Sequence, residues 1–111
     1  MEDRRSNRRI RIVSHLEVLL KGNGTHINAF STNLSRNGVG FCTGKEIQAN
    51  QEVEIKIYFE NPSKQKIMEN IPCRIQWVKQ ISRIYEAGAQ FLSTDLNNYP
   101  ILSQHIPHLE P

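Results

Sequence analysis

The chain has 111 residues, the length of one domain, and its 38% hydrophobic content is enough for one small core. It has neither an apolar run near the roughly 20 residues of a membrane span nor an apolar amino-terminal signal, which predicts a cytoplasmic protein. The formal charge of +3 lies wholly in residues 1–11, because residues 12–111 carry nine basic and nine acidic side chains. This distribution argues against a broad nucleic-acid-binding face and indicates a neutral body with a cationic arm.

The arm is the segment RRSNRRIRI at residues 4–12. It contains arginines and no lysines, and a guanidinium offers a rigid fork of donors that fits phosphate or the O6/N7 edge of guanine. A solvated arm that aids solubility, or one that contacts polyanions without specificity, has the same composition. Composition alone leaves these interpretations open.

The first half of the body alternates with the two-residue period of β-strands. Residues 10–20 form the first such strand, with apolar side chains on one face at Ile10, Ile12, Leu16, Val18 and Leu20. Lys21-Gly-Asn-Gly24 predicts a hairpin turn, and residues 25–35 run back as the second strand. Arg36-Asn-Gly38 then turns the chain into a short third strand at 39–44.

The second half continues this pattern. Residues 52–59 alternate strictly, and Asn-Pro opens a polar connector at 61–65. A fifth strand is predicted at 71–80 and a sixth at 85–92. The inward side chains predicted for the fifth strand are Ile71, Cys73, Ile75 and Trp77. Phe59 and Phe91 are expected in the core.

The carboxyl-terminal tail holds the helical candidate. Asp95 or Asn98 is expected to cap a short turn that carries Leu96, Tyr99, Ile101 and Leu102, and Pro107 stops regular structure after it. Six short strands and one terminal helix predict an all-β fold, a small six-stranded antiparallel β-barrel. The expected organisation is a flexible arginine-rich arm at 1–9, the barrel at 10–94, and a short helix and tail at 95–111.

The sequence contains no recognisable catalytic or metal-binding pattern. His105-Ile-Pro-His108 has two histidines three residues apart, but Pro107 breaks the helix that would align them. Cys42 and Cys73 lack CxxC spacing and are expected to be reduced, buried thiols. A binding protein that is not an enzyme is therefore expected, with no metal and no cofactor.

A second polar segment, NLSRNGVG, occupies residues 33–40. Asn33 and Ser35 are two residues apart and share one side of a strand end, and Gly38 follows three residues later. The amide and the hydroxyl can both donate and accept hydrogen bonds. Alone, such a segment is typical of a polar turn with a glycine.

The two polar segments together are more specific than either one. An RxxxR motif, Arg5 and Arg9, precedes the first strand, and a [D/N]xSxxG motif at Asn33, Ser35 and Gly38 follows about two strands later. A GxxF element begins at Gly88 on the last strand. Over nearly its whole length the sequence resembles the PilZ domain family, the bacterial receptors for cyclic di-GMP.

The resemblance implies a cytoplasmic receptor for this second messenger, which binds the ligand through the arm and the polar segment. The implied ligand-binding residues are Arg4, Arg5, Arg8, Arg9, Asn33, Ser35 and Gly38, with Arg36, Asn37, Trp77 and Gly88 as further candidates. Gly38 is expected to keep the wall of the site open. Arg4, just ahead of RxxxR, implies a stacked ligand dimer. Ordering of the arm would present a changed surface to a downstream protein partner.

Two alternatives stay open beside this interpretation. One is a nucleic-acid-binding β-barrel with a basic arm, against which the neutral body and the few candidate stacking aromatics argue. The other is a PilZ-like protein–protein adaptor that binds no nucleotide, against which the complete set of motif residues argues. The sequence names neither the downstream partner nor the oligomeric state.

Overall fold

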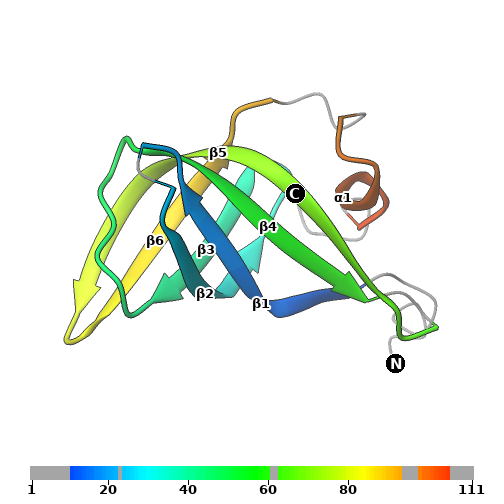
Figure 1. Ribbon diagram of the computed structural model, residues 1–111, viewed down its shortest axis with the longest axis horizontal. Coiled ribbons are helices and arrows are strands. Elements are labelled where there is room, and N and C mark those ends of the chain that lie inside the picture. The colour runs from blue at the N-terminus through cyan, green and yellow to red at the C-terminus, as the bar shows by residue number, and fades with distance from the viewer. Residues whose placement is uncertain (1–10, 23, 61–62, 94–97, 106–111) are drawn as a thin grey trace.

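The computed structural model describes residues 11–22, 24–60, 63–93 and 98–105. Its described part is a closed antiparallel β-barrel with one short helix, as predicted (Figure 1). The elements are β1 (Arg11–Leu20), β2 (His26–Leu34), β3 (Gly38–Thr43), β4 (Glu52–Glu60), β5 (Lys66–Ile81), β6 (Ile84–Phe91) and α1 (Pro100–His105). The strand order is β1-β2-β3-β6-β5-β4, and β1 pairs with β4 to close the barrel. Closure gives every strand a hydrogen-bonded neighbour on both sides.

The core is built from the inward face of each strand. β4 shows the alternation clearly, because Val53, Ile55, Ile57 and Phe59 are fully buried while the residues between them are not. Phe59 and Phe91 lie in the core, as predicted. Cys73 is buried as expected, whereas Cys42 is only partly buried because it lies on the outward face of β3.

The fifth strand differs from the prediction in the direction of Trp77. Ile75 pairs with Ala89, but Trp77 pairs with Gly88, so β5 has one more residue than β6 at this point. Such a bulge reverses the alternation of the residues that follow it. Trp77 is 48% exposed and Val78 packs against the core, so the predicted inward Trp77 is wrong.

The fifth strand also begins earlier than predicted. It starts at Lys66 and pairs with β4 from Glu60 onward, and this early part carries Glu69. The two carboxylate oxygens of Glu69 accept hydrogen bonds from the backbone N–H groups of Ile101 and Leu102, at 3.0 and 2.8 Å. A side chain from β5 therefore caps the helix, which lies beside β5 in Figure 1.

This cap corrects the one expected from the tail itself. The side-chain amide of Asn98 donates to the Ser93 hydroxyl at 3.2 Å and caps no helical N–H, while Asp95 and Leu96 lie outside the described residues. Tyr99 and Leu102 are buried in the core cluster, as their apolar character suggests. The helix is thus attached to the barrel by two buried side chains and by the Glu69 carboxylate.

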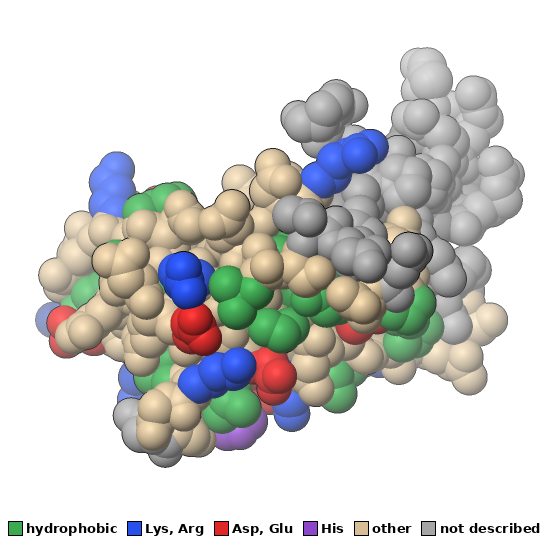
Figure 2. Space-filling model, turned by 90° about the horizontal axis from the view of Figure 1, so that it is seen from above, with side chains coloured by type: hydrophobic (Ala, Val, Ile, Leu, Met, Phe, Trp, Pro, Cys, Tyr) green, Lys and Arg blue, Asp and Glu red, His purple; other side chains and the backbone are tan. Residues whose placement is uncertain are grey.

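One face of the barrel carries charged side chains of both signs. Acidic and basic side chains are interspersed over the face shown in Figure 2. Arg74 donates to the Glu52 carboxylate at 2.7 Å, and this hydrogen bond holds the pKa of Glu52 below its usual value. On another part of the surface, the Tyr58 hydroxyl donates to Glu17 at 3.1 Å.

Candidate ligand-binding site

A pocket of about 330 Å³ lies on the outer surface of the barrel, over β3, β5 and β6 and the turn that precedes β3. Its lining residues are Thr32, Asn33, Ser35, Asn37, Gly38, Val39, Gly40, Gln76, Trp77, Glu86, Gly88, Ala89 and Gln90. Most of these side chains are polar, and Trp77 is the large aromatic among them.

Three glycines of β3 and β6 line the pocket. Gly40 of β3 pairs directly with Gly88 of β6, and Gly38 pairs with Gln90. Side chains of neighbouring strands occupy the space that these glycines leave. The Trp77 indole lies over Gly88, and the Thr32 and Asn33 side chains lie over Gly40.

Gly38 lines the pocket and also allows β3 and β6 to pack closely. A Cβ atom there would overlap the carbonyl oxygen of Ala89, and it would also come within 3.1 Å of the Gln90 Cα. Both obstacles are backbone atoms of β6, so β3 and β6 approach closely only because residue 38 is glycine. Gly38 thus permits strand packing, which is a structural requirement beyond an open wall.

Asn33 is positioned by a second bulge. Ser31 pairs with Phe41, but Asn33 pairs with Gly40, so β2 carries an extra residue there. The Asn33 Oδ1 accepts a hydrogen bond from the Gly40 N–H at 3.2 Å. Its Nδ2 has no hydrogen-bond partner among the residues that the structure describes. Asn33 can therefore offer two donors to a ligand while its oxygen is occupied.

Ser35 shapes the turn between β2 and β3. Its backbone N–H donates to the Gly38 carbonyl at 2.9 Å, and its hydroxyl accepts from the Asn37 N–H at 3.3 Å. The hydroxyl also approaches the Gly38 carbonyl at 3.4 Å. This is the turn geometry that polar residues commonly stabilise, and it places the hydroxyl at the rim of the pocket.

The opposite wall comes from β5 and β6. The indole of Trp77 lies over Gly88, where a Cβ atom would overlap its Nε1 and approach its Cε2 to 2.7 Å. The Gln76 amide donates to the Gln90 side-chain oxygen at 2.5 Å and joins the two strands across the pocket. Trp77 faces outward here because of the bulge in β5.

The structure brings together six of the residues implied by the sequence motifs. Asn33, Ser35, Asn37, Gly38, Trp77 and Gly88 all line this one pocket. Arg36 is exposed and is not among the lining residues. Arg4, Arg5, Arg8 and Arg9 lie outside the described residues.

Sequence reasoning missed several lining residues, among them Thr32, Gly40, Gln76, Glu86 and Gln90. The outward positions of β6 could have been predicted from the sequence. Ala87, Ala89 and Phe91 are apolar and inward, so residues 86, 88 and 90 face outward together. The bulges that bring Thr32 and Gln76 to the pocket could not be predicted from the alternation of apolar and polar side chains.

In the part of the chain that the structure describes, no group of three or more His, Cys, Asp or Glu side chains is placed to hold a metal ion. No helix among the described residues is long and apolar enough to cross a membrane.

Residues 3–106 match the model of the family described as PilZ domain. No curated protein matches the chain. The matched segment covers the barrel, the pocket and the arginine motif, and it is far more than half of the chain. This chain therefore belongs to the PilZ domain family.

Proposed function

We propose that this protein is a receptor for cyclic di-GMP and that it binds the ligand at the pocket over β3, β5 and β6. The observation that carries the proposal is the convergence of the polar motif of residues 33–38 with Trp77 and Gly88 on one surface pocket. The PilZ family consists in general of receptors for this ligand. The proposed role is binding and signalling without catalysis.

The chemistry of the pocket suits a ligand with bases, sugars and phosphates. The Asn33 Nδ2 can donate to a guanine O6, to N7 or to a phosphate oxygen, because the Oδ1 is already bound to Gly40. The Trp77 indole offers an aromatic face on which a base can stack. Trp77 is 48% exposed, so part of the indole is open to such a base.

The two negative charges of the ligand need cationic partners, and no Lys or Arg is among the described residues that line the pocket. Arg5 and Arg9 of the RxxxR motif are the proposed partners, because guanidinium forks form strong charge-assisted bonds with phosphate. Closure of the arginine segment over the ligand costs conformational entropy, so several such bonds are needed for useful affinity. The closed segment would present a changed surface to a downstream protein.

Calorimetric titration of the full chain tests the proposal. Cyclic di-GMP should bind in preference to GTP, cyclic AMP and a short single-stranded DNA. Arg5→Ala or Arg9→Ala should lower the affinity on the order of a hundredfold, because each removes charged hydrogen bonds worth roughly 1.5–3 kcal/mol each. The melting temperature should hardly change, because the sequence predicts that Arg5 and Arg9 lie outside the core, and surface substitutions typically cost about 0.5 kcal/mol or less.

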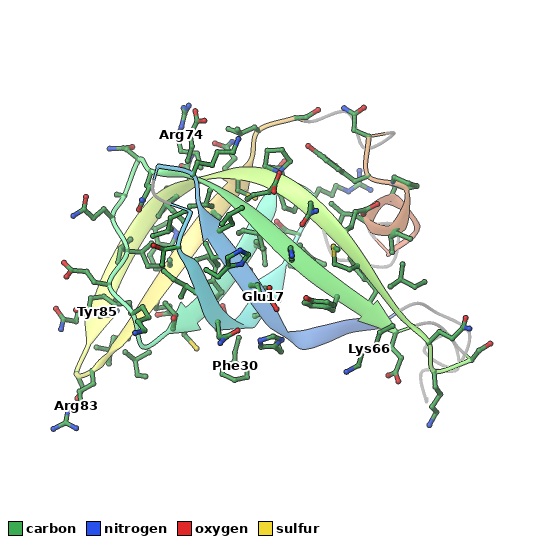
Figure 3. The ribbon with its side chains drawn as sticks, viewed as in Figure 1. Glu17, Phe30, Lys66, Arg74, Arg83 and Tyr85 are labelled. Carbon is green, nitrogen blue, oxygen red and sulfur yellow. The ribbon has the colours of Figure 1, made fainter. Side chains whose placement is uncertain are left out.

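Arg83→Ala is the matched control for these variants. Arg83 lies exposed at the tip of the β5–β6 hairpin and does not line the pocket (Figure 3). It should bind cyclic di-GMP like the wild-type protein. Equal heats for all nucleotides, or equal losses in the three arginine variants, would contradict the proposal. A preference for the single strand would favour the nucleic-acid-binding alternative.

The stoichiometry is part of the same proposal. Arg4 can add a further guanidinium fork to a second ligand molecule, so two stacked molecules are expected for each chain. Arg4→Ala should reduce the endpoint of the titration from two to one. An endpoint of one in the wild-type protein, unchanged in the variant, would show that the ligand binds as a single molecule.

A further inference from the structure

Glu86 lines the pocket, and the proposed function assigns no role to its carboxylate. It belongs to β6, is partly buried, and lines the pocket together with Trp77 and Gly88. Its strand neighbours are Cys42 on β3 and Lys79 on β5. Among the residues that the structure describes, none forms a hydrogen bond or an ion pair with the Glu86 carboxylate.

A free carboxylate is unexpected in a site for an anionic ligand. Its charge repels phosphate, so it weakens binding unless it meets a hydrogen-bond donor of the ligand. An ionised carboxylate has two acceptor oxygens and no donor. Guanine offers two adjacent donors, N1–H and the N2 amino group, whereas adenine presents an acceptor at N1.

The geometry places this carboxylate where the edge of a base can reach it. Trp77 pairs with Gly88, and Glu86 is two residues from Gly88 on the same face of β6, about 7 Å along the strand. The indole lies over Gly88, and Glu86 lines the same pocket two residues away on β6. A guanine stacked on the exposed part of the Trp77 indole can turn its N1–N2 edge toward Glu86.

The other end of the pocket can hold the phosphates away from this charge. Gly38 pairs with Gln90, which is four residues from Glu86, about 13 Å along β6. At physiological salt, charges in water are largely screened beyond about 8 Å. Repulsion between the carboxylate and the phosphates therefore weakens binding only slightly. The hydrogen bonds of the carboxylate to the base contribute more to the binding free energy than this repulsion removes.

We propose that Glu86 reads the N1–N2 edge of guanine and makes the site selective for guanine over other purines. This proposal rests on the proposed function, because it assigns a specificity role within the same pocket. A charge-assisted pair of bonds discriminates strongly, since a purine without the donors leaves the carboxylate desolvated and unpaired.

Calorimetry with three cyclic dinucleotides separates this role from a merely structural one. The ligands are cyclic di-GMP, cyclic di-IMP, whose hypoxanthine lacks the N2 amino group, and cyclic di-AMP. The wild-type protein should bind cyclic di-GMP at least tenfold more tightly than cyclic di-IMP. Glu86→Gln should weaken cyclic di-GMP about 10- to 100-fold and reduce its preference over cyclic di-IMP to less than threefold.

Glu54→Gln is the matched control, because Glu54 lies on β4 and does not line the pocket. It should keep both the affinity and the preference of the wild type. If the wild type binds cyclic di-GMP but Glu86→Gln keeps the same preference, the role of Glu86 is refuted and the proposed function stands. Equal losses in the two variants would also refute it. If the wild type binds no cyclic di-GMP, the proposed function fails first.

Discussion

Replacement of Gly38 by alanine should destabilise the barrel even without ligand. The added Cβ would overlap the Ala89 carbonyl oxygen and crowd the Gln90 Cα, and neither atom can rotate away because both belong to the β6 backbone. β3 and β6 would have to separate beside the hydrogen bond from the Phe91 N–H to the Asn37 carbonyl, which is 2.9 Å long.

The magnitude follows from three effects. Overpacking typically costs about 1–3 kcal/mol, and a weakened backbone hydrogen bond costs about 1 kcal/mol. Alanine also lowers the conformational entropy of the unfolded chain, and this effect offsets less than about 1 kcal/mol of the loss. The net loss should be about 2–3 kcal/mol. At about 4 °C per kcal/mol, this corresponds to a melting temperature lowered by roughly 8–12 °C.

Gly40→Ala is the matched comparison on the same strand. A Cβ there meets the Thr32 Oγ1 at 2.8 Å and the Asn33 Oδ1 at 3.0 Å, and both belong to exposed side chains that can rotate. The unfolding free energy of the Gly40→Ala variant should therefore differ from that of the wild type by less than about 1 kcal/mol. Ligand affinity should nevertheless fall, because Asn33 is displaced.

Chemical and thermal unfolding, followed by circular dichroism, measures both variants. The expected result is a large shift for Gly38→Ala and a small one for Gly40→Ala. If Gly38→Ala melts within about 2 °C of the wild type, β3 and β6 can separate without cost, and the packing role of this glycine is refuted.

Two further predictions concern the helix and the thiols. Glu69→Ala should lower the unfolding free energy by about 1–3 kcal/mol, because it leaves the N–H groups of Ile101 and Leu102 without their acceptors. Glu69→Gln keeps one acceptor oxygen and should recover part of this loss in the same unfolding assay. Equal stability of the wild type and both variants would argue against the cap. Burial raises the pKa of the Cys73 thiol to about 12, so at pH 8 an aromatic disulfide reagent should titrate one thiol, Cys42, in the folded protein and two in denaturant. Because the folded pKa of Cys73 lies above the unfolded value near 9, its contribution to stability should be complete below about pH 9 and lost as the pH rises toward 12. Two reactive thiols in the folded protein would contradict this burial.

The alternation of apolar and polar residues was sufficient to predict the six strands and the barrel. In β4 every second residue is apolar, and burial of that face is the dominant favourable term in folding. The early part of β5 was missed because Lys66, Glu69 and Asn70 have weak strand propensity. Pairing with β4 overrides that propensity and extends the strand to Lys66.

The candidate site was predicted only in part. The polar motif led to Asn33, Ser35 and Gly38, since its residues are neighbours along the chain. Glu86, Gln76 and Gln90 reach the same pocket through the pairing of β3, β5 and β6, which no local pattern reports.

Local patterns in the sequence therefore determined the elements whose stability depends on near neighbours: the alternating strands, the hairpin turns and the position of the short helix. Only the tertiary structure decided the features that depend on distant partners. The bulge at Gln76 turns Trp77 out to the pocket, and Glu69 caps a helix 32 residues further along the chain. Both result from strand register and packing, which are determined by the barrel as a whole.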